Sequence, residues 1–124
     1  MNTKRQGKDG EDLACMYISE KGGKILSRNY AIRDAEIDII FEEPATENPF
    51  DIRSYIVFTE VKSRNSCISG KPYESVTKAK IKKIVKAAKH YLYVNHYPES
   101  TAIRFDVISI ENGEISHYRN AFEP

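Results

Sequence analysis

The order of helical and strand patterns along the 124 residues constrains the fold more than any other feature. Apolar side chains recur at helical spacing over residues 4–21 and again over residues 77–95. Runs rich in β-branched and aromatic residues, which favour strands, occupy residues 24–31, 35–41, 55–62, 102–110 and 114–118. The resulting order, α-β-β-β-α-β-β, predicts an α/β fold in which a mixed β-sheet is flanked by helices.

Turn and capping residues set the ends of these elements. Gly22-Gly23 ends the first helix, and its start is expected nearer Asp9 because Gly7 and Gly10 weaken the first turns. Either Ser75 or Thr77 caps the second helix, and Asn112-Gly113 predicts a hairpin between the last two strands.

Length and composition exclude several classes of protein. A chain of 124 residues fits one domain, 1–124, with a sizeable core. The two cysteines, Cys15 and Cys67, are too few for a disulfide framework or a zinc cluster. No apolar run approaches the roughly 20 residues of a membrane span, and the N-terminus has no signal-peptide core, so no membrane contact and a cytoplasmic location are expected.

Charge is distributed unevenly, although the formal net charge is only +1. Residues 34–51 hold seven acids and no base, whereas residues 60–91 hold nine Lys or Arg and two acids. An acidic pole beside a basic pole suits a cation bound next to a polyanion. Two solvated faces would explain the same pattern without any function.

Charged residues interrupt two strands that are otherwise apolar. If residues 35–41 and 55–62 form an antiparallel hairpin around residues 48 and 49, facing residues have numbers that sum to 97 or 98. With the sum of 98, the side chains of Glu36, Asp38, Glu60 and Lys62 share one side of the sheet. Ile37, Ile39, Phe41, Val57, Thr59 and Val61 would then face a helix from the other side.

Such a cluster suits a hard cation. Neighbouring carboxylates repel, which raises a pKa or recruits a cation, and Mg²⁺ or Mn²⁺ prefers oxygen ligands. Lys62 could then orient an attacking water or stabilise charge on a phosphate. A surface hairpin with cross-strand salt bridges is the alternative that does not involve function.

Further charged residues extend this hypothesis. Glu11 shares a helix face with Ala14 and Ile18, so it faces the sheet, although a carboxylate near a helix N-terminus is also favoured by the dipole alone. Side chains that could hold a phosphate backbone, or could simply be solvated, are Arg64, Lys80, Lys82 and Lys86. Asp106 is expected to pair with Arg104 or a lysine, and the three histidines lack metal-ligand spacing.

Several short motifs together resemble a known family. They are Gly7-x-x-Gly10-Glu11-x-x-Ala14, Arg28-Asn29-Tyr30, Glu36-Ile37-Asp38-Ile39-Ile40, Phe58-x-Glu60-Val61-Lys62-x-Arg64, Lys80, Arg104-Phe105-Asp106-Val107 and Asn120-Ala121-Phe122. This combination, which covers nearly the whole chain, resembles the UPF0102 (YraN-like) family. That family in turn resembles the PD-(D/E)xK nucleases and, among them, the archaeal Holliday junction resolvases.

The resemblance implies a restriction-endonuclease-like αβββαβ core and a nuclease site that uses Mg²⁺ or Mn²⁺. By position, Asp38 and Glu60 would be metal ligands, Glu11 would complete the ligand shell directly or through water, and Lys62 would be the catalytic lysine. The expected activity is hydrolysis of phosphodiesters in nucleic acid, with DNA favoured, with selectivity for branched structures, and with a homodimer suggested by the resolvases. A nucleic-acid-binding module without turnover and an interaction or scaffold protein are the alternatives.

Overall fold

A computed structural model describes residues 3–44, 54–64 and 76–124, with side chains from residue 9 onward except that of Arg64. Two helices and five strands follow the expected order: α1 (Thr3–Glu20), β1 (Lys24–Ile32), β2 (Ala35–Glu43), β3 (Tyr55–Arg64), α2 (Lys78–Val94), β4 (Ile103–Glu111) and β5 (Glu114–Tyr118). Expectations for Cys67 and Ser75 lie outside the described residues.

Helix α1 begins earlier than expected and ends where expected. It starts at Thr3, so the prediction of a start nearer Asp9 was wrong. Gly10 is buried where α1 crosses β3, and a Cβ there would lie 3.0 Å from that of Ser63, so its small size serves close packing. At the other end, Gly22 adopts a φ of 91°, and the amide of Gly23 donates to the carbonyl of Ile18 at 2.9 Å.

The sheet has five strands in the order β1-β2-β3-β4-β5. Only β3 and β4 are parallel, and α2 lies between them in the sequence. β2 and β3 pair antiparallel through Ile39–Thr59, Ile40–Phe58 and Phe41–Val57, which confirms the register in which facing numbers sum to 98.

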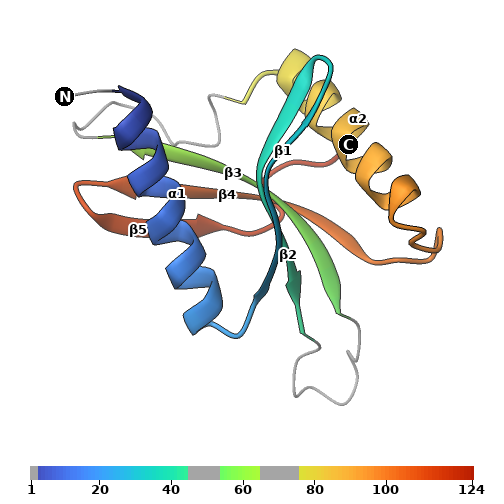
Figure 1. Cartoon of the computed structure of the whole chain (residues 1–124), viewed down its shortest axis with the longest axis horizontal. Coiled ribbons are helices and arrows are strands. Elements are labelled where there is room, and N and C mark those ends of the chain that lie inside the picture. Colours follow the sequence, from blue (N-terminus) through green and yellow to red (C-terminus); the bar gives the residue numbers. More distant parts are fainter. Residues whose placement is uncertain (1–2, 45–53, 65–75) are drawn as a thin grey trace.

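Each helix covers one face of the sheet (Figure 1). The core under α1 contains Ala14, Ile18, Ile39, Phe41, Val57, Ile108 and Ile110. The core under α2 contains Ile37, Ile40, Ile56, Phe58, Val76, Ile84, Ala87, Ala88, Tyr91, Phe105 and Val107. Strands that are buried on both faces, as β2 and β3 are, read as nearly continuous apolar runs.

Ile37 corrects one expectation about these faces. It packs in the core under α2, not with Ile39 and Phe41 in the core under α1. Pairing between β2 and β3 runs only from Ile39 to Glu43, so the N-terminal part of β2 no longer follows the plane set by β3. Strict alternation between the two faces therefore fails where β2 separates from β3.

Thr77 begins α2 and so fixes the side chains of its first turn. Its Oγ1 accepts a hydrogen bond from the amide of Lys80 at 3.2 Å, as an N-cap does. The buried face of the helix presents Ile84, Ala87, Ala88 and Tyr91 to the sheet. Among the described residues, neither helix has the length and apolar character needed to cross a membrane.

Candidate functional site: an acidic cavity beside two lysines

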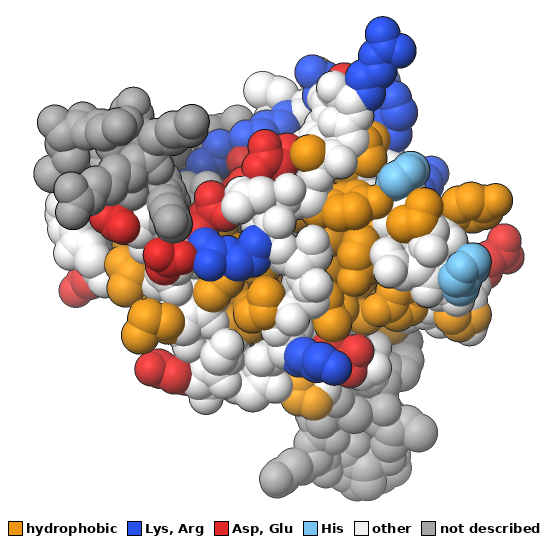
Figure 2. Space-filling model, viewed as in Figure 1, with side chains coloured by type: hydrophobic (Ala, Val, Ile, Leu, Met, Phe, Trp, Pro, Cys, Tyr) orange, Lys and Arg blue, Asp and Glu red, His pale blue; other side chains and the backbone are white. Residues whose placement is uncertain are grey.

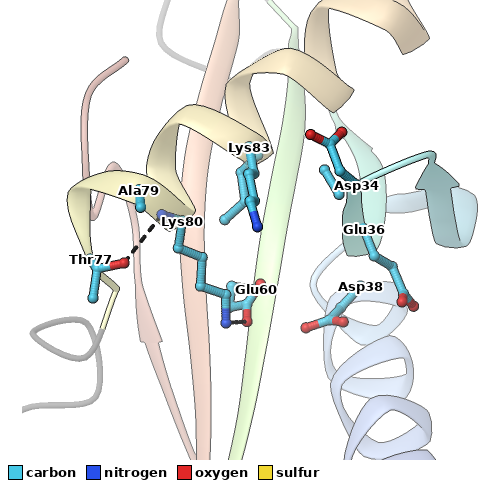
Figure 3. Close-up of a pocket in the computed structure, with 10 residues that line it drawn as sticks. Asp34, Glu36, Asp38, Glu60, Thr77, Ala79, Lys80 and Lys83 are labelled. Atoms are coloured by element: carbon cyan, nitrogen blue, oxygen red, sulfur yellow. Dashed lines mark hydrogen bonds and ion pairs between the residues drawn. The ribbon is translucent and has the colours of Figure 1, made fainter.

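A cavity of about 480 Å³ opens where β2 separates from β3 beneath the start of α2. We call it the acidic cavity, and its lining is Asp34, Ala35, Glu36, Asp38, Glu60, Thr77, Ala79, Lys80, Lys83 and Ile84. Acidic side chains enter from β2 and β3, and lysines enter from α2 (Figure 3). On the molecular surface, acidic and basic side chains gather between α1 and the start of α2 (Figure 2).

Asp38 marks the point at which the two strands separate. The last backbone pair of β2 and β3 is Ile39–Thr59, and beyond it the carboxylate Oδ2 of Asp38 accepts from the amide of Val61 at 2.8 Å. A side chain thus takes over a bond that the strand ladder would have made, which fixes the carboxylate on β3. Burial and the charge of Glu60 raise the pKa of Asp38 to about 7, against the hydrogen bond from Val61.

Glu60 reaches the same cavity from β3 and is held by two lysines. Its Oε1 lies 2.5 Å from the Nζ of Lys80 and 3.4 Å from the Nζ of Lys62. Burial lowers the pKa of Lys62, an effect that the charge of Glu60 only partly opposes. Burial acts in the same direction on Lys80, but its hydrogen bond and charge interaction with Glu60 contribute to a net rise in its pKa.

Glu11 approaches this group from the other face, on α1. Glu11 does not line the acidic cavity, but its charge raises the pKa of Asp38. The charge of Glu36, in turn, raises the pKa of Glu11. Burial is the main cause of the raised pKa of Glu11. Its Oε1 is buried and has no hydrogen-bond partner among the described residues. A buried carboxylate oxygen in that state has free capacity for a cation.

The basic residues that the sequence suggested do not all meet at the cavity. Lys80 lines it, whereas Lys82 and Lys86 line a separate pocket of about 340 Å³ on the outer side of α2. Lys86 also forms an ion pair with Asp34 at 3.3 Å. The backbone of Arg64 pairs with Glu111 in the sheet, and its side chain lies outside the described part.

Sequence reasoning missed Lys83, which lines the acidic cavity. The spacing contained a usable signal, because Lys83 lies three residues after Lys80 and residues three apart share a helix face. In the described part of the chain, no three His, Cys, Asp or Glu side chains are placed to hold a metal together. Asp38 and Glu60 are two carboxylates, so a metal there would take its other ligands from water and substrate.

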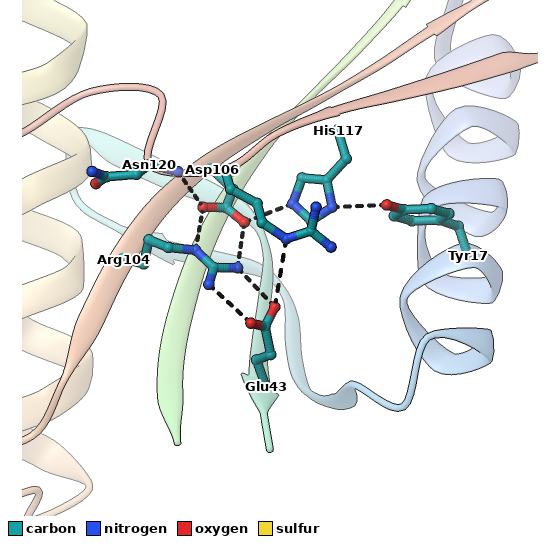
Figure 4. A network of polar contacts seen from close by, with 7 residues as sticks. Tyr17, Glu43, Arg104, Asp106, His117 and Asn120 are labelled. Atoms are coloured by element: carbon teal, nitrogen blue, oxygen red, sulfur yellow. Dashed lines mark hydrogen bonds and ion pairs between the residues drawn. The ribbon is translucent and has the colours of Figure 1, made fainter. Parts of the chain in front are cut away.

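A second charged cluster lies at another part of the sheet (Figure 4). We call it the arginine network, and it joins Tyr17, Glu43, Arg104, Asp106, His117 and Asn120. The Nε of Arg104 lies 2.8 Å from Oδ1 of Asp106, and the Nε2 of His117 lies 2.6 Å from Oδ2. The expected pairing of Asp106 with Arg104 is thereby confirmed, and His117 has a structural role.

Comparisons with known proteins place the chain in a family. The model of "Uncharacterised protein family UPF0102" matches residues 10–110. A "UPF0102 protein" of Lachnoclostridium phytofermentans is 45% identical over 123 residues, which is 99% of this chain and 97% of the relative. One of Persephonella marina is 42% identical over 118 residues, covering 95% of this chain and 93% of the relative.

The solved structures that match include that of Pyrococcus furiosus SfsA in complex with Ca²⁺. It is 16% identical, covers 99% of this chain and 66% of that chain, and has a TM-score of 0.28, too low to support an argument. The family model and the two relatives are sufficient to assign the family: this chain belongs to the uncharacterised protein family UPF0102.

Proposed function

We propose that this protein is a metal-dependent nuclease that hydrolyses phosphodiesters in nucleic acid, with DNA as the favoured substrate. The observation that carries the proposal is that Asp38 and Glu60 enter one cavity from neighbouring strands, with the ammonium groups of Lys62 and Lys80 on Glu60. Carboxylates and amines so arranged suit chemistry on an anionic phosphate.

The donor groups fit a divalent cation that prefers oxygen ligands. Asp38 receives one hydrogen bond and lies in surroundings that raise its pKa, and Glu11 has a buried oxygen without a partner among the described residues. Mg²⁺ or Mn²⁺ would be held by Asp38 and Glu60, with Glu11 contributing through a water molecule. Bound there, the metal would lower the pKa of a water molecule and stabilise charge on the phosphate.

The chain's own side chains supply the remaining functions. Lys62 holds and orients water or a phosphate oxygen beside Glu60, and its lowered pKa makes exchange of a proton easier. Lys80 and Lys83, on the wall formed by α2, neutralise the phosphate backbone without reading sequence. Cutting selected by DNA structure, and a homodimer that presents two sites, remain predictions from the resemblance.

The test uses branched, nicked and linear DNA, and RNA of matched sequence, with Mg²⁺ or Mn²⁺. Substituting Glu60→Gln or Lys62→Met should lower the cleavage rate by about 100-fold or more while nucleic-acid binding persists. Glu99→Gln, an exposed change just beyond α2, serves as the control and should cut like wild type. Tight, salt-dependent binding without cleavage in any metal would favour the binding module. The absence of both would favour a scaffold.

A further inference from the structure

Asn29 has an unusual backbone conformation for a residue inside a strand. Its φ is 53°, in the left-handed region that residues with a side chain seldom occupy. The other such residues that are not glycine, among those described, are His96 after α2, Asn112 in the turn between β4 and β5, and Asn120 after β5. Backbone outliers within regular structure persist only where the surrounding structure holds them, and they often occur at functional sites.

The register of the sheet places Asn29 beside the candidate site. β1 and β2 pair through Arg28–Ile39 and Tyr30–Ile37, so Asn29 is at the position across from Asp38. Asp38 in turn bonds the amide of Val61 on β3. The irregular position of β1 therefore lies at the level where β2 leaves β3 and the acidic cavity opens.

The side chain of Asn29 acts on Glu11. Burial raises the pKa of the Glu11 carboxyl group above its ordinary value, and a side-chain hydrogen bond from Asn29 partly opposes that rise. The neighbouring Arg28 forms an ion pair with Asp12 at 2.7 Å, so consecutive residues of β1 hold consecutive residues of α1. The buried Oε1 of Glu11 is left without a partner among the described residues.

We infer that Asn29 is a positioning residue for the proposed site: its left-handed backbone presents its amide to Glu11, which keeps the unpartnered oxygen of Glu11 available to a divalent cation held by Asp38 and Glu60. This inference rests on the proposed function. Residues that bond a metal ligand, without touching the metal, typically change metal affinity by about 10–100-fold when they are removed.

The substitution Asn29→Gly tests the contribution of the side-chain amide separately from that of the backbone conformation. Glycine adopts a positive φ without steric cost, so the strand conformation is kept and only the side chain is lost. The Kd for Mn²⁺, measured by calorimetry on the full chain without nucleic acid, should rise about tenfold, with little change in the thermal midpoint. Asn112→Gly, at a φ of 51° in the β4–β5 turn, is the matched control and should bind Mn²⁺ as wild type does.

A double-mutant cycle tests whether Asn29 acts through Glu11. If it does, Asn29→Gly combined with Glu11→Gln should bind Mn²⁺ no more weakly than Glu11→Gln alone. Full additivity, or wild-type affinity in Asn29→Gly, would overturn the inference. If Asp38→Asn weakens binding while Asn29→Gly does not, only the inference fails. If the wild type binds no Mn²⁺, or Asp38→Asn binds it unchanged, the proposed metal site fails as well.

Discussion

The acidic cavity and the arginine network both bury carboxylates on one sheet, yet they shift the pKa values of those carboxylates in opposite directions. Asp106, fully buried, accepts hydrogen bonds from Arg104, from His117 and from the amide of Asn120. Burial raises the pKa of Asp106, but these bonds together outweigh it and lower that pKa. Among the residues that the structure describes, Asp38 accepts one bond, from Val61, and its pKa rises to about 7.

The difference shows what each cluster contributes. A buried carboxylate with all its acceptor positions used is stable as part of the fold and has little capacity left for a ligand. A carboxylate that the fold leaves short of partners carries an energetic cost, and such groups occur mostly at functional sites. We therefore assign the arginine network to stability, and the acidic cavity is the site at which we propose that function resides.

The largest expected effect is on the arginine network. Arg104→Met would leave the charges of Asp106 and Glu43 without their main partner, because Arg104 bonds Glu43 through both terminal nitrogens and Asp106 through Nε and one of them. Removing one member of a buried ion pair costs about 3–5 kcal/mol, which urea unfolding at pH 7 would measure.

Arg119→Met provides the matched control. Arg119 lies 4.0 Å from the same Glu43 but is half exposed, so its loss should cost less than about 1 kcal/mol. Equal effects of the two substitutions would show that the arginine network does not stabilise the fold as we infer.

The next largest effect is the pH dependence of the free energy of unfolding, which has opposite signs for the buried carboxylates of the two clusters. Asp38 has a folded-state pKa of about 7 against an ordinary 3.8, so its favourable contribution is complete below pH 4 and is lost as pH rises through 7. Asp38→Asn cannot ionise and can still accept the bond from Val61. Its stability relative to wild type should therefore grow from pH 4 to pH 8, by up to a few kcal/mol at about 1.4 kcal/mol per pKa unit.

Asp106→Asn should behave in the reverse way. The pKa of Asp106 is lowered, so its contribution is present above the ordinary value and is lost as pH falls through the folded-state pKa. The substitution should destabilise the protein at pH 7 and less so in acid. Unfolding curves for both variants at pH 4, 6 and 8 would test this, and parallel pH profiles would contradict the assignment of the two clusters.

The sequence predicted those parts of this comparison that depend on local patterns. Hydrophobic periodicity and turn residues located each helix and strand that the structure describes, and the hairpin register brought Asp38 and Glu60 together correctly. Of the two kinds of partner expected for Asp106, Arg104 or a lysine, the structure shows Arg104, which lies two residues away on the same strand. Each inference needed only positions along one or two neighbouring strands.

Features that depend on three-dimensional placement could not be predicted in the same way. The contact of Lys80 with Glu60 joins α2 to β3, and the bonds from Arg104 to Glu43 join β4 to β2. The left-handed Asn29 and the position of Ile37 both arise where β2 leaves β3, an irregularity that period alone does not reveal. Tertiary packing, which single-sequence patterns do not contain, decides such details.

The smallest expected effect concerns the positive charge that pairs with Glu60 before a metal binds. The ammonium of Lys80, 2.5 Å from Oε1 of Glu60, occupies the carboxylate that a metal would need, and about 40% of its side chain is exposed, so it can leave. Lys80→Met should therefore lower the Kd for Mn²⁺ by about tenfold, equal to about 1.4 kcal/mol, in calorimetric titration.

Lys83→Met is the control, because it removes the same charge from the same cavity, and among the described residues Lys83 has no ion pair with Glu60. It should change the Kd less. If both variants gain equally, the effect is one of net charge. If Lys80→Met binds Mn²⁺ more weakly than wild type, Lys80 supports the metal site instead of competing for it.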